Sequence, residues 1–279
     1  MRKFAKSFLV IMLSFLVVFG CSAFAIAPDT PITKQLPILM YHKVAPKNPS
    51  KYIVTTKQLA DDWAALKATG YTPVFMSEVI DWVNGKGELP DKPIVITFDD
   101  GQYNNLYYGL PLAQEYGIKY LINPVTAYSE KSMADHDSTN PRYSNLDWAS
   151  IKQGYDSGLI EYGNHSHDLH RTGNPYGVAP KRHEDSAAYA ERLRTDIDHA
   201  QNLLTACGIP APTTFAYPFG KYTPATRDLL LDMGFQALLT CNEHTNTITR
   251  GDPSCLYALG RFNRSGNLST AAMLKKIGG

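Results

Sequence analysis

Short apolar runs rich in β-branched and aromatic residues alternate along the chain with amphipathic stretches. The apolar runs have the length of strands, whereas the longer stretches repeat apolar positions at the spacing of one helix face. The predicted strands cover residues 36–44, 71–75, 93–98, 118–125, 159–163, 213–217, 235–240 and 256–262. The predicted helices begin near Thr55, Ser77, Leu106, Leu146, Ala187 and Pro224. This alternation predicts an α/β fold with parallel strands.

The number of these elements favours a distorted (β/α) barrel of about seven parallel strands in a single domain. In such a barrel the functional side chains gather at the C-terminal ends of the strands. Residues 129–145 and 171–188 are polar and lack a clear period, so we expect them to be loops.

Residues 1–27 have the pattern of an export signal. A basic start precedes an apolar run that is too short for a confident membrane span, and small residues then offer cleavage positions. Lipidation at Cys21 and retention as an uncleaved anchor are alternatives that the pattern leaves open. Residues 28–35 are predicted to be a linker, so we expect the domain to cover residues 36–279 of an extracellular or envelope-associated protein.

Composition excludes several classes of partner. The 279 residues carry a formal net charge of +1 without a basic run, so nucleic acid is not expected as a partner. No coiled-coil heptad is evident, and we expect a monomer without an obligate protein partner. A disulfide between Cys241 and Cys255, and three free thiols that include Cys207, are both compatible with the cysteine spacing.

Two adjacent carboxylates, Asp99 and Asp100, follow the apolar run 93–98. Neighbouring side chains on a strand point to opposite sides, so the two acids are expected to have different roles, and Gly101 permits a turn there. A solvated Asp-Gly turn is the alternative structural interpretation. His42 lies near the end of the first predicted strand, where it could belong either to the core or to the same site.

A second polar strand end contains three histidines and one aspartate within residues 165–170. Neutral imidazole and carboxylate are ligands that suit zinc and neighbouring divalent metals, so these residues predict a metal site. His165 and His170 are five residues apart, about 140° around a helix, so they would have to converge through a loop. A histidine-rich exposed turn without a metal is the alternative.

At this point the chain resembles the polysaccharide deacetylases of carbohydrate esterase family 4, over nearly all of residues 36–262. The matching segments are Leu39-Met40-Tyr41-His42-Lys43-Val44, Thr97-Phe98-Asp99-Asp100-Gly101, Gly163-Asn164-His165-Ser166-His167-Asp168-Leu169-His170, Phe215-Ala216-Tyr217-Pro218-Phe219-Gly220 and Leu259-Gly260-Arg261-Phe262. The five-residue spacing of the two histidines is similar to that of the branch containing biofilm-glycan deacetylases.

The resemblance implies that Asp99 is the general base and that Asp100, His165 and His170 bind one divalent metal ion. Zinc is the expected ion, with cobalt or nickel as alternatives. Such an ion would acidify a water and polarise an acetyl carbonyl, while the adjacent Asp99 takes a proton.

The same resemblance assigns the backbone N–H of Phe219 as an oxyanion donor and places Tyr217, Pro218 and Phe219 against the substrate. The implied substrate is a polymer containing N-acetylglucosamine, with peptidoglycan and poly-N-acetylglucosamine ahead of chitin and acetylated xylan. The implied reaction is hydrolysis of the N-acetyl group with release of acetate. A metal-dependent amidase, an ester deacetylase and a non-catalytic glycan-binding protein are the alternatives.

The chain departs from the family pattern in two places. An arginine that often orients the base is replaced by Ala216, and we expect Arg261, at the end of the last predicted strand, to approach Asp99 instead. The late histidine that protonates the leaving amine is also not evident, which leaves His42, His183, His244 or a water as candidates for the acid.

Overall fold

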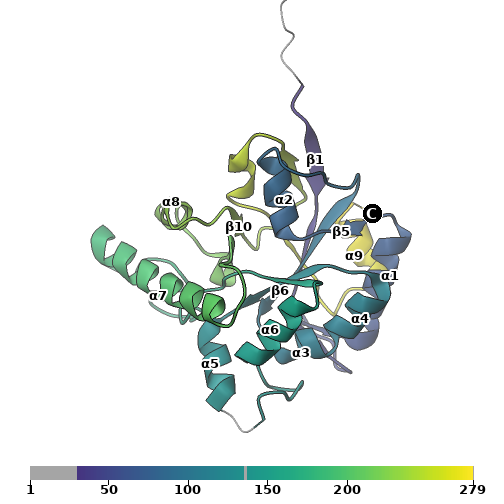
Figure 1. Cartoon of the computed structure of the whole chain (residues 1–279), viewed down its shortest axis with the longest axis horizontal. Helices are drawn as coiled ribbons and strands as arrows, with labels where there is room; N and C mark the ends of the chain where they lie inside the picture. Colours follow the sequence, from purple (N-terminus) through teal and green to yellow (C-terminus); the bar gives the residue numbers. More distant parts are fainter. Residues whose placement is uncertain (1–29, 135–136, 279) are drawn as a thin grey trace, which may run out of the picture. The chain divides into compact units, whose positions relative to one another are not determined.

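The computed structural model describes residues 30–134 and 137–278, so the predicted signal at residues 1–27 lies outside the described residues. The strands are β1 (Thr33–Leu36), β2 (Ile38–Tyr41), β3 (Lys43–Ala45), β4 (Ile53–Thr55), β5 (Thr72–Pro73), β6 (Pro93–Asp100), β7 (Tyr120–Pro124), β8 (Ile160–Tyr162), β9 (Thr214–Ala216), β10 (Ala237–Leu239), β11 (Asn246–Thr249) and β12 (Phe262–Asn263). The helices are α1 (Thr56–Ala68), α2 (Met76–Val83), α3 (Tyr103–Tyr107), α4 (Gly109–Tyr116), α5 (Thr126–Ala134), α6 (Trp148–Asp156), α7 (Ser186–Ala206), α8 (Pro224–Asp232) and α9 (Thr270–Lys276), with short 3-10 turns η1 (Pro218–Gly220) and η2 (Pro253–Leu256). Figure 1 shows their arrangement.

Parallel strands follow one another around a ring. Ladders join β12, β2, β6, β7 and β8 in that order, and a separate ladder joins β9 to β10. Two isolated parallel bridges link these sheets, Asn164 to Phe215 and Leu239 to Leu259, the latter just before β12. The expected α/β fold with a distorted (β/α) barrel is therefore confirmed. Its distortion lies at these two seams, where single bridges replace ladders and the ladders alone do not close the ring.

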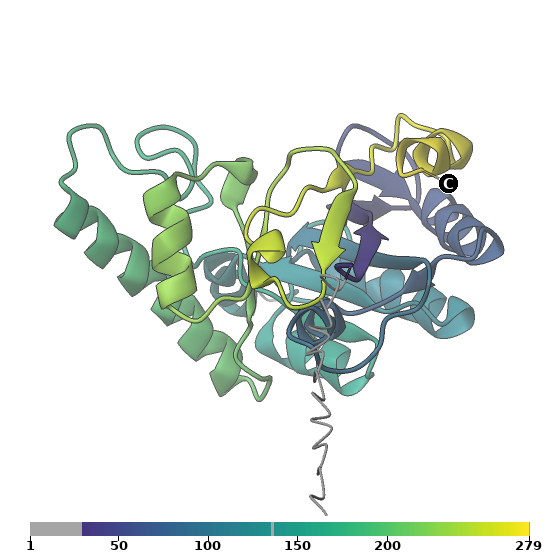
Figure 2. The same cartoon turned by 90° about the horizontal axis from the view of Figure 1, so that it is seen from above.

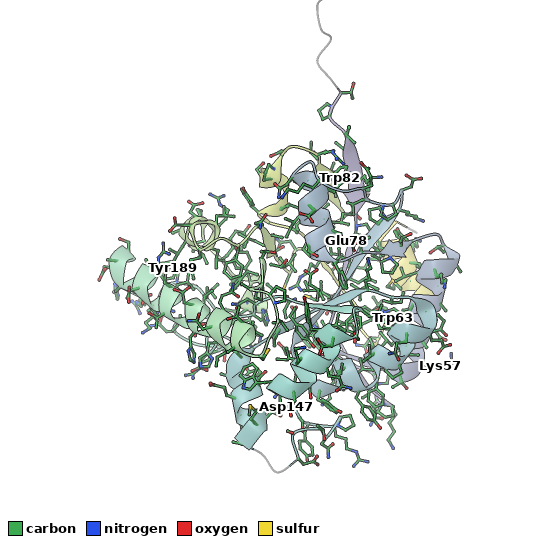
Figure 3. All side chains as sticks on the ribbon, in the orientation of Figure 1. Lys57, Trp63, Glu78, Trp82, Asp147 and Tyr189 are labelled. Carbon is green, nitrogen blue, oxygen red and sulfur yellow. The ribbon has the colours of Figure 1, made fainter. Side chains whose placement is uncertain are left out.

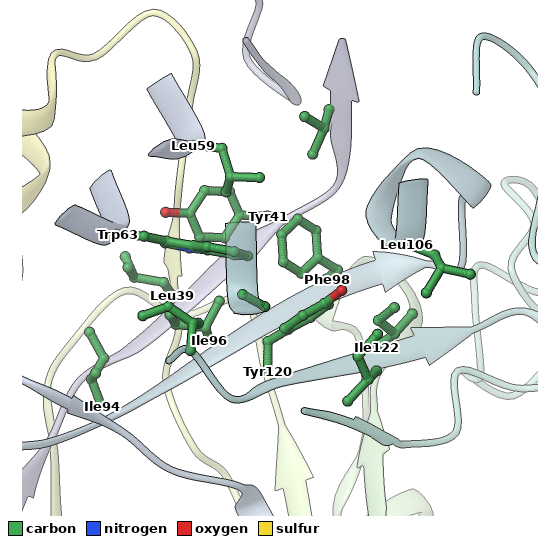
Figure 4. Close-up of a cluster of buried hydrophobic side chains, with 14 of the residues drawn as sticks. Leu39, Tyr41, Leu59, Trp63, Ile94, Ile96, Phe98, Leu106, Tyr120 and Ile122 are labelled. Atoms are coloured by element: carbon green, nitrogen blue, oxygen red, sulfur yellow. The ribbon is translucent and has the colours of Figure 1, made fainter. Parts of the chain in front are cut away.

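The central strand β6 separates two parts of the core. Ile96 and Phe98 pack in one hydrophobic cluster with Trp63 of α1, whose ring centroid is 6.5 Å from that of Phe98 (Figure 4). Val95 belongs to a second cluster that includes residues of β2, β7, β9 and β10. Because side chains alternate along a strand, Asp99 falls on the side of Val95, toward the residues of the other barrel strands.

Helices pack around the strands in groups. Helix α1 contacts both α4 and α9, and α5 contacts α7 (Figures 1 and 2).

The predicted helix start at Thr55 is confirmed, because Thr55 and Gln58 form a reciprocal capping box at the start of α1. Tyr189, labelled on α7 in Figure 3, is buried. Its hydroxyl donates a hydrogen bond to the carbonyl of Val178 at 3.0 Å. Among the described residues, no helix has the length and apolarity needed to cross a membrane.

The polar region 129–145 is not entirely a loop, because α5 extends into it. Amide groups in the first turn of α5, those of Thr126 and Ala127, donate to the carbonyls of Ser166 and His167. These partners lie far away in the sequence and satisfy donors that a helix start leaves open. The sequence pattern alone therefore could not reveal this helix.

Three other predicted boundaries were wrong. The single helix expected to begin near Leu106 is instead the two helices α3 and α4, because Pro111 cannot donate the backbone hydrogen bond that a continuous helix would need. The last expected strand, 256–262, is reduced to β12 after the turn η2. The expected linker, 28–35, contains the start of β1, which pairs antiparallel with β11, and the compact unit begins at Ile32.

Candidate metal centre and active site

Asp100, His165 and His170 converge at the C-terminal end of β6 and in the loop after β8. Asp100 Oδ1 is 3.8 Å from His165 Nε2 and 3.4 Å from His170 Nε2. This carboxylate oxygen is buried and has no hydrogen-bond partner among the described residues. A divalent cation would satisfy that oxygen and engage both imidazole nitrogens, so the donor set fits the predicted metal.

The protonation states of these side chains also suit a metal. His165 Nδ1 donates to the carbonyl of Ala216 at 2.7 Å, which leaves Nε2 with a free lone pair. Burial lowers the pKa of His165 to about 3 and lowers the pKa of His170, so both rings are neutral at neutral pH. Burial raises the pKa of Asp100 to about 6, a shift that a bound cation would oppose.

Unusual backbone conformations aim these side chains. Asp100, Ser166 and Phe219 have φ angles of 73°, 70° and 58°, in the left-handed region that residues other than glycine rarely adopt. Gly101, at φ 70°, is also required, because a Cβ there would lie 2.7 Å from Cβ of Pro124. Strained positions of this kind gather at functional sites, and here they lie where β6, the loop after β8 and the turn after β9 meet.

Asp99 is held in a buried hydrogen-bond network. Its carboxylate accepts bonds from Arg261 Nη1 and Nη2 and from Asn123 Nδ2, each at 2.8 Å. Arg261 is fully buried and also donates from Nε to the carbonyl of Thr240. Burial alone would raise the pKa of Asp99, but the Arg261 guanidinium outweighs it and holds that pKa well below its usual range. The expected approach of Arg261 to Asp99 is present.

Asn123 was missed by the sequence reasoning. It is a polar residue near the end of the apolar strand β7, directly opposite Asp99 in the ladder between β6 and β7. Its place at the C-terminal end of a strand could have identified it as a neighbour of Asp99, because adjacent parallel strands bring residues at their C-terminal ends side by side.

A cavity of about 1060 Å³ opens over the site and is lined by His42, Asp99, Asp100, both metal-site histidines and Phe219. His42 Nδ1 is buried without a hydrogen-bond partner in the described structure, and burial lowers the pKa of His42. His183 and His244, the other histidines considered as the acid, are not among the residues lining the cavity.

Only Phe219 of the segment 217–219 faces the cavity. Its ring lies 4.3 Å from that of His170 and 4.7 Å from that of Tyr176, measured between centroids. Tyr217 is fully buried and stacks on Tyr222, and Pro218 is also buried. This corrects the expectation that the side chains of Tyr217 and Pro218 contact the substrate.

The three described cysteines, Cys207, Cys241 and Cys255, are all free. Of the two alternatives, the structure has the three free thiols and not the disulfide between Cys241 and Cys255. Cys241 instead lines the cavity.

The family model for polysaccharide deacetylases matches residues 86–238. The chain is 26% identical over 206 residues to the poly-β-1,6-N-acetyl-D-glucosamine N-deacetylase of Escherichia coli K12, which covers 67% of this chain and 30% of that enzyme. It is 27% identical over 227 residues to the protein of the same name from Staphylococcus epidermidis, with 75% of this chain and 73% of that protein covered. The chain thus spans less than a third of the length of the Escherichia coli relative.

Solved structures agree on the fold. A de-N-acetylase from Aggregatibacter actinomycetemcomitans superimposes with a TM-score of 0.75 at 21% identity, over 87% of this chain and all of that one. IcaB from Ammonifex degensii superimposes with a TM-score of 0.71 at 24% identity, over 88% of this chain and 98% of that one. With the family model matching more than half of its residues, the chain belongs to the polysaccharide deacetylase family.

Proposed function

We propose that this chain is an exported, metal-dependent deacetylase that hydrolyses N-acetyl groups of N-acetylglucosamine units in a polysaccharide. The observation that carries the proposal is the placement of Asp99 beside the Asp100, His165 and His170 triad in one cavity. Poly-β-1,6-N-acetylglucosamine is the first polymer to test, because two relatives are named for it, and peptidoglycan is the second. We include export in the proposal because residues 1–27 have the sequence pattern of an export signal.

When bound, a divalent cation supplies Lewis acidity to the acetyl carbonyl and to an attacking water. The ligand set suits zinc, with cobalt and nickel as alternatives. Asp99 stays ionised beside Arg261, and its Oδ2 accepts only one hydrogen bond from the described residues, so it can take the proton of the attacking water.

Other residues complete the reaction. The backbone N–H of Phe219 donates to the developing oxyanion. Burial favours the neutral form of His42, so the proton it gives comes from the reaction itself: His42, whose Nδ1 lacks a protein partner, takes the proton collected by Asp99 and passes it to the leaving amine. The water oxygen bonds to the carbonyl carbon, the C–N bond breaks, and acetate and a free amine leave. The exposed faces of Phe219 and Tyr176 offer aromatic surface to the sugar rings.

Removal of the metal is expected to abolish acetate release, because Asp100 and the two imidazoles cannot polarise a carbonyl alone. Acetate would be measured from poly-β-1,6-N-acetylglucosamine, peptidoglycan, chitin and acetylated xylan before and after treatment with a chelator. Addition of zinc, cobalt or nickel to the stripped protein should restore release. The proposal fails if the metal-loaded protein releases no acetate from any polymer, or if protein shown to be metal-free keeps its activity.

Substitution of Gly163 by alanine is expected to lower kcat by about ten- to a hundredfold. A Cβ at Gly163 would lie 2.1 Å from Asn123 Oδ1, so the amide that holds Asp99 would have to move. The backbone of Gly163 cannot shift easily, since its N–H is bonded to the carbonyl of Ile122. Steady-state kinetics on the best polymer would measure the change.

Gly154→Ala is the matched control. Its Cβ would meet a side-chain oxygen at a similar distance, 2.2 Å from the hydroxyl of Tyr162, but Gly154 lies on α6 and does not line the cavity. We expect this variant to lose stability and keep its kcat. Equal kinetic effects in the two variants would show that the loss comes from general strain and not from Asn123.

A further inference from the structure

A second group of potential metal ligands lies outside the site described above. Glu130 of α5, His167 of the loop after β8 and His199 of α7 offer ligand atoms that all lie within 4.8 Å of one another. His167 Nε2 is 3.7 Å from Glu130 Oε2, and the rings of His167 and His199 meet edge to face with centroids 4.4 Å apart. Three separate elements therefore direct one carboxylate and two imidazoles toward a single point.

His167 is oriented as metal-bound histidines usually are. Its Nδ1 lies 2.9 Å from the hydroxyl of Thr126, a fully buried residue at the start of α5. With Nδ1 donating to that oxygen, Nε2 presents its lone pair toward Glu130. A hydrogen bond of this kind to the second ring nitrogen fixes the tautomer and the ring of a metal ligand.

The backbone around His167 is also fixed. The carboxylate of Asp196 accepts the N–H groups of His167 and Asp168, each at 2.8 Å, and the carbonyl of His167 accepts the N–H of Ala127. The loop is thus already attached to α7 through Asp196 and to α5 through Ala127. The central ligand of the cluster is held in place before any ion arrives.

The other two ligands can adjust. Glu130 and His199 are exposed, and neither side chain has a hydrogen-bond partner among the described residues. Ligand atoms around a tetrahedral zinc lie about 3.4 Å apart, given metal–ligand distances of about 2.1 Å. Small rotations of these two side chains would bring the ligand atoms to that separation without breaking a hydrogen bond within the protein.

We propose that Glu130, His167 and His199 bind a second divalent transition-metal ion, for which zinc is the preferred candidate. Two imidazoles and one carboxylate are a zinc ligand set, and water can complete the coordination. The ion ties α5 and α7 to the loop that carries His165 and His170. Its role is to hold that loop, and it does not contact the substrate cavity, since none of its three ligands lines the cavity.

Zinc stoichiometry of the full chain tests the proposal. The stripped protein would be titrated with zinc by calorimetry, and the bound metal would be counted by elemental analysis. We expect two ions per wild-type chain and one ion per chain in His199→Ala, a substitution at an exposed helical position that alanine suits. The control is His183→Asn, which removes another exposed histidine at a left-handed position that asparagine tolerates and should leave two ions.

Two further variants separate this site from the catalytic one. Asp100→Asn combined with His170→Gln should retain one ion, and addition of His199→Ala to that pair should leave none. Thr126→Val should weaken the second site by about ten- to a hundredfold through the loss of the bond to His167. None of these measurements uses acetate release, so failure of the proposed function would not affect them.

Hydrogen exchange gives an independent readout. In the Asp100→Asn and His170→Gln background, zinc should slow amide exchange in residues 166–168 and in the first turn of α5. The proposal is overturned if saturating zinc gives one ion per wild-type chain, if His199→Ala still binds two, or if zinc leaves exchange in this background unchanged.

Discussion

Replacement of Asp99 by asparagine is expected to lower kcat by about 10²- to 10⁴-fold while the metal content of the catalytic site is retained. An amide cannot take the proton of the attacking water, whereas Asp100, His165 and His170 keep their positions. The amide NH2 of asparagine would also face N–H donors of Arg261 or Asn123, which would then lack an acceptor, so stability should fall as well. Acetate release would be measured well below the melting temperature, and elemental analysis and thermal unfolding would be carried out on the same preparation.

Asp62→Asn is the control for this variant. Asp62 is fully buried and paired with the guanidinium of Arg264, so its substitution disturbs a similar buried ion pair. It lies on α1 and does not line the cavity, and we therefore expect a loss of stability with little change in kcat. A kcat for Asp99→Asn within tenfold of the wild-type value would remove Asp99 from the role of general base.

The sequence was sufficient to predict that the side chains of Asp99 and Asp100 point in different directions. Alternation along β6 turns Asp99 toward the residues of the other barrel strands, and the positive φ of Asp100 turns the next carboxylate toward the histidines. The convergence of strand ends likewise allowed Arg261 to be placed near Asp99, although the two residues are far apart in the chain. Parallel barrels make such predictions possible, because every strand delivers its last residues to one edge.

The same alternation, applied to β9, would have corrected the prediction for Tyr217. Phe215 and Tyr217 are two residues apart, so both point into one hydrophobic cluster, beside helices α7 and α8, while Ala216 points the other way. Only after the chain turns at Phe219, with its positive φ, does a side chain of this segment reach the cavity. Family motifs identify a segment, but local geometry decides which of its side chains face the substrate.

Long-range pairing explains what the sequence pattern missed in the fold. Strand β1 has little apolar character and exists because it pairs with β11, more than two hundred residues later. Helix α5 begins where the carbonyls of Ser166 and His167, in the loop after β8, accept hydrogen bonds from its first amide groups. Neither element has a strong periodic signal of its own, and each is stabilised by partners that local patterns cannot identify.

Replacement of Arg261 by methionine is expected to destabilise the protein by about 3–5 kcal/mol, because Asp99 would remain buried without its counter-charge. The folded-state pKa of Asp99 is depressed, so the pair contributes stability above the unfolded pKa of about 3.9 and loses it as pH falls toward the folded value. The destabilisation should therefore be full at neutral pH and shrink in acid. Chemical unfolding at a series of pH values would measure it.

The kinetic consequence separates positioning of the base from mere structural support. Without Arg261, burial raises the pKa of Asp99, so the acidic limb of the kcat/KM profile should move to higher pH. Arg261→Lys should restore part of the stability and move the acidic limb part of the way back, because lysine restores the positive charge without the bidentate geometry of arginine. Arg264→Met, which breaks the other buried pair, should destabilise the protein and leave the profile in place. If both methionine variants shift the profile equally, Arg261 does not act through Asp99, and the low pKa of that carboxylate has another cause.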